Sequence, residues 1–399
     1  NLSVDLYVEQ VIAEAKLVIV RLIGGTGYWP YGIEQIAGIA REKGTALAVI
    51  PGDDKPDADL MARSTLEPSA VQRIWTYLVQ GGVDNATSLL GYAGTLIGWD
   101  AEWTEPAPLM SAGLYWPDLE LPSLEDLQAR WEPARPAAAI VFYRALVQAG
   151  NVKPVDALIT ALSERGLNPL PIYVSSLKDV ASAELVSGTL AAVDTAVVLN
   201  ATGFAVSKPG SARAETPFDI ADCPVLQVIF SGGDRESWEE STAGLSARDI
   251  AMNVALPEVD GRVLSRAVSF KAAAPFDPIT ECSIVAYEPV PDRIAFTASL
   301  AASWARLRRA QPFDRRVVMV LANYPNKDAR IGNGVGLDTP TSAVKVLREL
   351  SEHGYGVTDV PADGEALMTK LLAGPTNALS GRDHKTGGII FSLADYRIF

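Results

Sequence analysis

Apolar segments alternate with helix-like segments at three places along the chain. The apolar runs at 17–23 (LVIVRLI), 137–143 (AAAIVFY) and 315–322 (RRVVMVLA) each lead through a loop into an amphipathic segment, and a further apolar run follows. Short apolar runs predict buried strands, whereas apolar positions three or four residues apart predict helices. Because strands and helices alternate, we expect parallel sheets covered by helices on both faces.

Glycines and two further apolar runs extend this pattern. Gly44, Gly166 and Gly354 follow predicted helices at the position where a left-handed backbone ends a helix. The runs in 194–205 (DTAVVLNATGFA) and 223–233 (CPVLQVIFSGG) predict two more strands that lead into loops. The predicted fold class is therefore α/β, with several doubly wound, Rossmann-like parallel-sheet units joined by connectors rich in Pro and Trp. Ligands of such sheets bind outside the carboxyl ends of the strands.

The same pattern predicts the domain boundaries. We expect a first α/β unit at 1–102, a connector at 103–136, a second α/β unit at 137–290, and a helix with a third α/β unit at 291–399. The first predicted helix has no strand before it, and a new segment starts at the far end. We therefore infer a piece that is truncated at both ends, taken from a longer polypeptide.

Composition narrows the class of protein. The 399 residues carry a formal net charge of −14, which opposes binding to a phosphate backbone, so we expect no nucleic acid. The mean hydropathy of +0.13, without a long apolar run or a signal peptide, predicts a cytoplasmic protein without a membrane partner. Cys223 and Cys282 lack the spacing of a zinc site.

The loop at 321–340 (LANYPNKDARIGNGVGLDTP) contains glycine at three alternate positions. Thr339 and Pro340 are typical of the N-cap and first residue of a helix, whose unpaired amides favour an anion nearby. Lys327 and Arg330 add positive charge, so an anion-binding loop is one hypothesis. A well-capped crossover is the alternative, in which the polar side chains form the turns of the loop.

Common nucleotide motifs are incomplete in this sequence. A phosphate-binding P-loop is missing, because His384 stands where the second glycine would precede Lys385. Gly25 and Gly27 begin a dinucleotide fingerprint, but Pro30 occupies the third glycine position. A dinucleotide-dependent oxidoreductase stays a weaker hypothesis, and ATP hydrolysis by this chain is not expected.

The sequence places no catalytic residue and no metal site. It holds two histidines, without the spacing of a metal-binding pair. Glu258 and Asp260 could hold a cation or act as acid and base, whereas a turn at Gly261 is the simpler interpretation.

Longer segments are similar to a known family. RLIGGTGYWPYGIEQI, LAVIPGDD, YLVQGGVDN, NVALPEVDGR and VLANYPNKDARIGNGVGLDTPTSAVKVLREL resemble, in this order, the large subunits of aerobic cobaltochelatase, which are relatives of the magnesium chelatase H subunit. The resemblance implies a tetrapyrrole-binding ligase subunit that inserts Co²⁺, the metal substrate, into hydrogenobyrinic acid a,c-diamide during cobalamin biosynthesis. It also implies that the AAA+ partner subunits, CobS and CobT, hydrolyse ATP.

Under that resemblance, cations near strand ends would bind the carboxylates of the tetrapyrrole, and aromatic side chains would lie against its ring. Arg21 and Arg144 are additional cations of this kind. The candidate substrate-binding residues are Tyr28, Trp29, Asn323, Tyr324, Lys327, Arg330, Gly332, Asn333, Gly334, Gly336, Asp338 and Thr339. Two alternatives remain open, a subunit of the magnesium chelatase H type and a non-catalytic docking module for AAA+ chelatase subunits.

Overall fold

A computed structural model describes residues 2–322, 328–376, 381, 384–388 and 390–399. The chain divides into two compact units, 1–305 and 306–399. The first unit contains two separate sheets, and the division between the units falls within one long helix, α13 (Pro291–Arg309). Each unit is described by itself below.

The first sheet consists of two parallel strands, β1 (Leu17–Leu22) and β2 (Ala46–Pro51). Residues 47–51 of β2 are buried, as its apolar sequence predicts. Apolar side chains of α1 and α2 pack with β1 and β2 in one core, and α4 and α5 contribute to a second core against β2. The helices of this region are α1 (Leu2–Gln10), η1 (Ile12–Glu14), α2 (Pro30–Lys43), α3 (Ala58–Met61), α4 (Pro68–Gln80) and α5 (Val83–Leu96).

The second sheet has seven strands in the order β3-β5-β4-β6-β7-β8-β9. The five strands from β5 to β8 are parallel, and an antiparallel strand lies at each edge. The predicted α/β class, with a mostly parallel sheet, is confirmed. The strands are β3 (Ala112–Leu114), β4 (Ala137–Tyr143), β5 (Asn168–Val174), β6 (Thr195–Asn200), β7 (Val225–Ser231), β8 (Val263–Asp277) and β9 (Cys282–Pro289).

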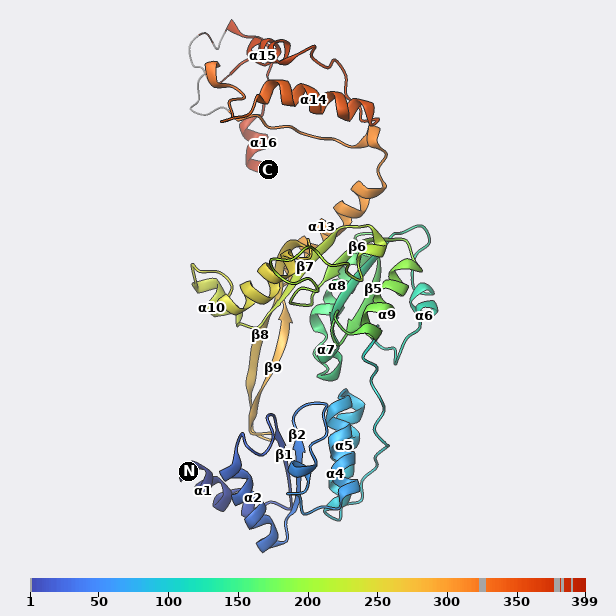
Figure 1. Ribbon diagram of the computed structural model, residues 1–399, viewed down its shortest axis with the longest axis vertical. Helices are drawn as coiled ribbons and strands as arrows, with labels where there is room; N and C mark the ends of the chain where they lie inside the picture. Colours follow the sequence, from blue (N-terminus) through green and yellow to red (C-terminus); the bar gives the residue numbers. More distant parts are fainter. Residues whose placement is uncertain (1, 323–327, 377–380, 382–383, 389) are drawn as a thin grey trace. The chain divides into compact units, whose positions relative to one another are not determined.

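Helices cover both faces of this sheet (Figure 1). Alternate side chains of β4 point to opposite faces, so Ile140 packs with α8 and α13, whereas Val141 packs with α9. Strand β6 is buried along its whole length, which explains the apolar run at its centre, residues 196–199. The helices are α6 (Leu124–Gln128), α7 (Arg144–Gln148), α8 (Lys153–Glu164), α9 (Val180–Ala191), η2 (Asp219–Ala221), α10 (Arg235–Glu240), α11 (Ala247–Ile250), the π-helical turn η3 (Ala251–Ala255) and α12 (Leu256–Glu258).

Two segments for which the sequence pattern predicted no strand contain regular structure. Residues 263–289 form the hairpin of β8 and β9, which Figure 1 shows as a long two-stranded arm. Pro275 and the run of alanines interrupt the alternating pattern, so this hairpin was not predicted. Within 103–136, β3 joins the sheet edge, and Leu127 of α6 is fully buried in the core.

The second unit is helical in its described part. Its helices are η4 (Pro312–Asp314), η5 (Asp328–Arg330), α14 (Thr339–Glu352), α15 (Gly364–Ala373) and α16 (Leu393–Ile398). The strands predicted at 315–322 and 355–361 are not formed, so these two predictions are wrong. A strand is stable only when it pairs with another strand, and no described segment pairs with either of them.

The three glycines predicted to end helices do so. Gly44, Gly166 and Gly354 have φ values of 72°, 76° and 82°, in the left-handed region that favours glycine. This prediction is confirmed.

Candidate functional site

The glycine-rich loop of the second unit is shaped by its backbone. Gly332 and Gly336 have φ values of 69° and 73°, which explains two of the glycines. At Gly334 an added Cβ would lie 2.9 Å from the hydroxyl oxygen of Thr339, so this position requires glycine for close approach. Asn323, Tyr324 and Lys327 lie outside the described residues. Arg330 is exposed at the end of the short helix η5.

The start of α14 differs from the prediction by one residue. Asp338, rather than Thr339, is the N-cap, because its carboxylate accepts a hydrogen bond from the Thr341 amide at 3.1 Å. The Thr339 amide donates to the Leu337 carbonyl and the Ser342 amide to the Asp338 carbonyl. Since Pro340 has no N–H, the unpaired amides predicted at this helix start are already satisfied, and that part of the anion-binding prediction is wrong.

The candidate residues near the N-terminus belong to the first unit. Tyr28 is 76% exposed, as a binding residue would be. Trp29 lies against the first turn of α2, where an added Cβ on Gly32 would come within 2.0 Å of its ring. Arg21 donates to the Gly52 carbonyl, and Arg144 donates to the carbonyls of Leu109 and Met110. These two arginines therefore hold loops in place.

A cleft of about 440 Å³ lies at the carboxyl ends of the parallel strands in the seven-stranded sheet. This is the edge at which ligands were expected, and β4 and β6, whose connections run in opposite directions, both end there. We call it the carboxyl-edge cleft. It is lined by Tyr143, Leu146, Ala201, Gly203, Phe204, Phe230, Gly232, Gly233, Ser246, Arg248, Asp249, Met252, Asn253, Lys271 and Tyr287.

One buried carboxylate lies in the wall of the carboxyl-edge cleft. Asp249 is 6% exposed and accepts hydrogen bonds from the Ser231 hydroxyl at 2.7 Å and the Asn253 amide group at 3.2 Å. The Gly232 amide is a third donor, at 3.3 Å. The carboxylate is therefore held by neutral donors inside the protein.

Two phenols also line the cleft. Burial raises the pKa of Tyr143 and of Tyr287 above the ordinary value, so both phenols are protonated at neutral pH. The Tyr143 hydroxyl donates to the Gly203 carbonyl at 3.2 Å. The Tyr287 amide donates to the Asn151 side chain at 2.9 Å, which fixes this part of β9 against the loop before α8.

The loop after β6 forms a strained wall of the cleft. Phe204 has a φ of 62° and is 47% exposed, although a bulky side chain disfavours this backbone conformation by about 1–3 kcal/mol. Its amide donates to the Met252 carbonyl in the π-helical turn at 2.8 Å. Gly203 permits this contact, because an added Cβ would lie 2.9 Å from Asn253 and 3.0 Å from Met252.

A buried ion pair also stabilises the loop after β6. The side chains of Asp260 and Arg262 are 1% and 2% exposed and lie 2.8 Å apart. Asp260 also accepts hydrogen bonds from the amides of Val206 and Ser207, at 2.8 and 2.9 Å. Burial acts to raise the pKa of the Asp260 carboxyl, but these amides and the Arg262 charge together hold it below its usual range. Because the Asp260 carboxylate is buried and already bound by Arg262 and two amides, the hypothesis that it holds a cation or acts as an acid is wrong.

Comparison with known proteins identifies the family. The family model described as CobN/Magnesium Chelatase matches residues 75–399. The chain belongs to this family. It is 49% identical over 409 aligned residues to the "Aerobic cobaltochelatase subunit CobN" of Sinorhizobium sp, covering 100% of this chain and 32% of that protein. It is 42% identical to the protein of the same description from Pseudomonas aeruginosa, covering 99% of this chain and 31% of that one.

Comparison with a solved structure agrees with the assignment to the CobN/magnesium chelatase family. The chain is similar to the "Catalytic Subunit of Cobaltochelatase from Mycobacterium tuberculosis", with a TM-score of 0.71 and 32% identity over 93% of this chain and 30% of that one. The chain therefore spans about a third of the length of the relatives that it matches.

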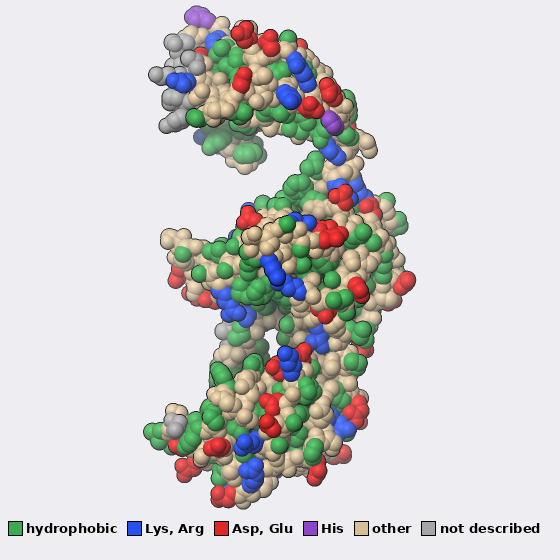
Figure 2. Space-filling view, viewed as in Figure 1, with side chains coloured by type: hydrophobic (Ala, Val, Ile, Leu, Met, Phe, Trp, Pro, Cys, Tyr) green, Lys and Arg blue, Asp and Glu red, His purple; other side chains and the backbone are tan. Residues whose placement is uncertain are grey.

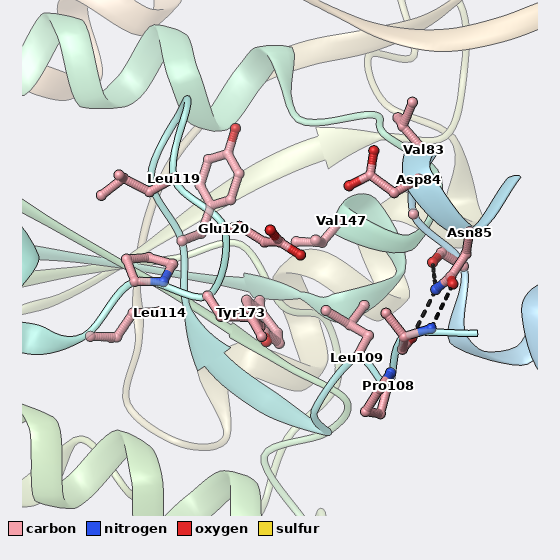
Figure 3. A pocket seen from close by; sticks show the side chains of 16 residues that line it. Val83, Asp84, Asn85, Pro108, Leu109, Leu114, Leu119, Glu120, Val147 and Tyr173 are labelled. Carbon is pink, nitrogen blue, oxygen red and sulfur yellow. Dashed lines mark hydrogen bonds between the residues drawn. The ribbon is translucent and has the colours of Figure 1, made fainter. Parts of the chain in front are cut away.

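A second cavity of about 220 Å³ lies within the first unit, next to the start of α5 (Figure 3). Leu109, Leu114 and Val147 give it apolar walls, and Asp84 and Glu120 are its charged residues. Asn85 closes one side through paired hydrogen bonds with the backbone of Ala107, at 2.9 Å each. No lysine or arginine is among its described lining residues, whereas the carboxyl-edge cleft is lined by Arg248 and Lys271.

Surface charge, metal-ligand groups and helix hydropathy are three further features of the described part of the chain. On the face drawn in Figure 2, Lys and Arg side chains are interspersed with Asp and Glu, without a continuous basic stripe. Within the described residues, no three His, Cys, Asp or Glu side chains are placed to share a metal ion. In the same part of the chain, every helix is too short or too polar to cross a membrane.

Sequence reasoning missed the residues of the carboxyl-edge cleft that carry charge. Gly232 and Gly233, which follow a predicted strand, were the sequence feature that indicated the location of this cleft. Arg248 lies in a helix of four residues, and Lys271 lies in the hairpin that was not predicted. Their proximity depends on the pairing of β8 with β7 and β9, which the sequence pattern did not show.

Proposed function

We propose that this chain is part of the tetrapyrrole-binding subunit of an ATP-dependent cobaltochelatase. The reaction is the insertion of Co²⁺ into hydrogenobyrinic acid a,c-diamide, in the cytoplasm, during cobalamin biosynthesis. The observation that carries this proposal is the 49% identity, over the whole chain, to a cobaltochelatase subunit. Partner AAA+ subunits, CobS and CobT, hydrolyse ATP, since this sequence has no P-loop.

Metal insertion sets chemical demands on the whole enzyme. A base must accept two protons from the ring nitrogens, the macrocycle must be held in a reactive shape, and the metal must lose water. This chain contributes binding and orientation, and the base belongs to a part of the enzyme beyond these residues. By itself the chain is therefore inactive in insertion, as a ligase subunit that needs its partners.

Each unit, taken by itself, contains residues proposed to contact the substrate. In the second unit, Arg330 is exposed and has no described ion-pair partner, so it is free to bind a carboxylate. In the first unit, the exposed ring of Tyr28 is available to lie against a macrocycle. Asn333 and the glycines shape the loop that carries Arg330. Asn323, Tyr324 and Lys327, outside the described residues, complete the proposed set.

Reconstitution tests this function. The chain, as part of the complete large subunit, is mixed with CobS, CobT, ATP, Co²⁺ and hydrogenobyrinic acid a,c-diamide, and insertion is followed by absorbance. We expect cobalt insertion that requires all three subunits. Insertion of Mg²⁺ into a porphyrin instead would show a subunit of the magnesium chelatase H type. Capture of CobS and CobT by a chain that does not bind the corrinoid would show a docking module.

A further inference from the structure

The carboxyl-edge cleft concentrates positive charge in an acidic protein. Arg248 and Lys271 both line it, and neither forms an ion pair with a described residue. Lys153 pairs with Glu288 and so neutralises the nearest carboxylate of β9. With Asp249 counted, the described lining carries a net charge of +1, whereas the whole chain carries −14. Such a local reversal of sign attracts anionic groups.

The two cations converge on one aromatic side chain. Lys271 lies directly opposite Tyr287 in the β8–β9 pairing, and its Nζ atom is 5.5 Å from the centre of the Tyr287 ring. Burial and the Asp249 charge raise the pKa of the Tyr287 phenol, and the Arg248 charge partly offsets this rise. A ligand beside Tyr287 would therefore meet Lys271 and Arg248 together with Asp249, a lining whose net charge is +1.

Phe204 is another aromatic side chain in the lining of the cleft. Phe204 is exposed there in its strained conformation, and the π-helical turn holds its amide. Strain of this kind, and π-helical turns, are concentrated at functional sites. Together, Phe204 and Tyr287 provide apolar surface in the lining of the cleft, while Arg248 and Lys271 provide charge.

The backbone at the cleft argues against a phosphate as the ligand. Phosphate sites use unpaired amides after a strand, but here the Gly232 amide donates to Asp249 and the Gly233 amide to the Ser231 hydroxyl, at 3.2 Å. Cationic side chains beside apolar walls suit a carboxylate on an apolar framework. The side chains of a tetrapyrrole acid have this chemistry.

We propose that the carboxyl-edge cleft binds a peripheral carboxylate of the tetrapyrrole, with Arg248 and Lys271 as its anchors and Phe204 and Tyr287 against the edge of the macrocycle. This inference rests on the proposed function and assigns it a subsite. The cations bind the side-chain carboxylate and take no part in proton transfer or metal coordination.

Equilibrium titration with hydrogenobyrinic acid a,c-diamide, followed by corrinoid absorbance, tests the assignment. For Arg248→Gln/Lys271→Gln we expect binding about 10- to 100-fold weaker than for the unchanged protein, because two charge-assisted contacts are lost. The matched control is Arg41→Gln/Lys43→Gln, which removes the same charge from the last turn of α2. We expect its affinity to stay within about twofold. Unchanged tryptophan fluorescence verifies that each variant is folded.

A second ligand separates the possible outcomes. A corrinoid in which every carboxylate is amidated should bind the unchanged protein and the Arg248→Gln/Lys271→Gln variant equally. If the unchanged protein does not bind the acid at all, the proposed function fails for this chain. If the acid binds but the cleft variant and the control variant bind it equally well, the proposed function stands and the cleft assignment is overturned.

Discussion

Removal of the buried carboxylate behind the cleft should strongly destabilise the first unit. The substitution is Asp260→Ala, at a side chain that is 1% exposed and 2.8 Å from the guanidinium of Arg262. It also removes the acceptor for the amides of Val206 and Ser207. These amides belong to the loop that carries Phe204, so the perturbation acts on the wall of the carboxyl-edge cleft.

The magnitude follows from the groups left without partners. Each orphaned amide costs about 1–3 kcal/mol, and a buried ion pair that loses one partner costs about 3–5 kcal/mol. Because these costs overlap, we expect Asp260→Ala to lower the free energy of unfolding by about 4–6 kcal/mol. Asp260→Asn, which keeps one acceptor, should lose less. The control Glu239→Ala breaks an exposed pair with Arg235 and should cost at most about 1 kcal/mol.

Tryptophan fluorescence during urea unfolding is the assay for this comparison. All eight tryptophans lie within residues 1–305, so their fluorescence reports on the first unit alone. If Asp260→Ala costs no more than Glu239→Ala, the buried pair does not support the loop, and the account of the cleft wall is incorrect.

Three further predictions concern the same molecule. Gly203→Ala should lower the free energy of unfolding by about 1–3 kcal/mol in the urea assay, because the added Cβ meets the Met252 carbonyl at 3.0 Å; no change would mean that the contact relaxes freely. The pKa of Asp260 is lower in the folded protein, so its ionised form stabilises the fold above about pH 4, and this contribution is lost as the pH falls through the folded pKa. The stability difference between the unchanged protein and Asp260→Asn should therefore shrink on acidification, as measured by unfolding at several pH values, and a constant difference would contradict the assignment. Arg330→Gln in the complete large subunit should weaken binding of hydrogenobyrinic acid a,c-diamide by about tenfold, and unchanged affinity would remove Arg330 from the proposed contacts.

The sequence was most informative where strands are buried on both sides. β4 and β6 are continuous apolar runs because helices cover both faces of the sheet, and that pattern is visible without coordinates. The turn glycines were equally clear, since a left-handed residue after a helix has few alternatives to glycine.

The predictions failed where structure depends on a distant partner. The run at 315–322 is as apolar as a buried strand, yet Val318 is 84% exposed, and this segment pairs with no strand in the described part of the chain. Proline and alanine residues interrupt the alternating pattern of the β8–β9 hairpin, so the pairing was not predicted. This hairpin brings Lys271 to the cleft. The positive φ of Phe204 has no signal in its residue type, and its amide donates to Met252 in the π-helical turn, a contact between distant parts of the sequence.

Cavities depend on the same distant pairings. The location of the carboxyl-edge cleft was predictable from the parallel strands and the glycines that follow β7. Its lining residues were not predictable, because Arg248 lies in a helix of four residues and Tyr287 lies in the edge strand.

A structure of the protein with bound hydrogenobyrinic acid a,c-diamide tests the central claim most directly. The account predicts a peripheral carboxylate of the corrinoid within about 4 Å of the Arg248 guanidinium or the Lys271 ammonium, beside the ring of Tyr287. A corrinoid that binds with its carboxylates away from both cations, and leaves the cleft to solvent, would contradict it.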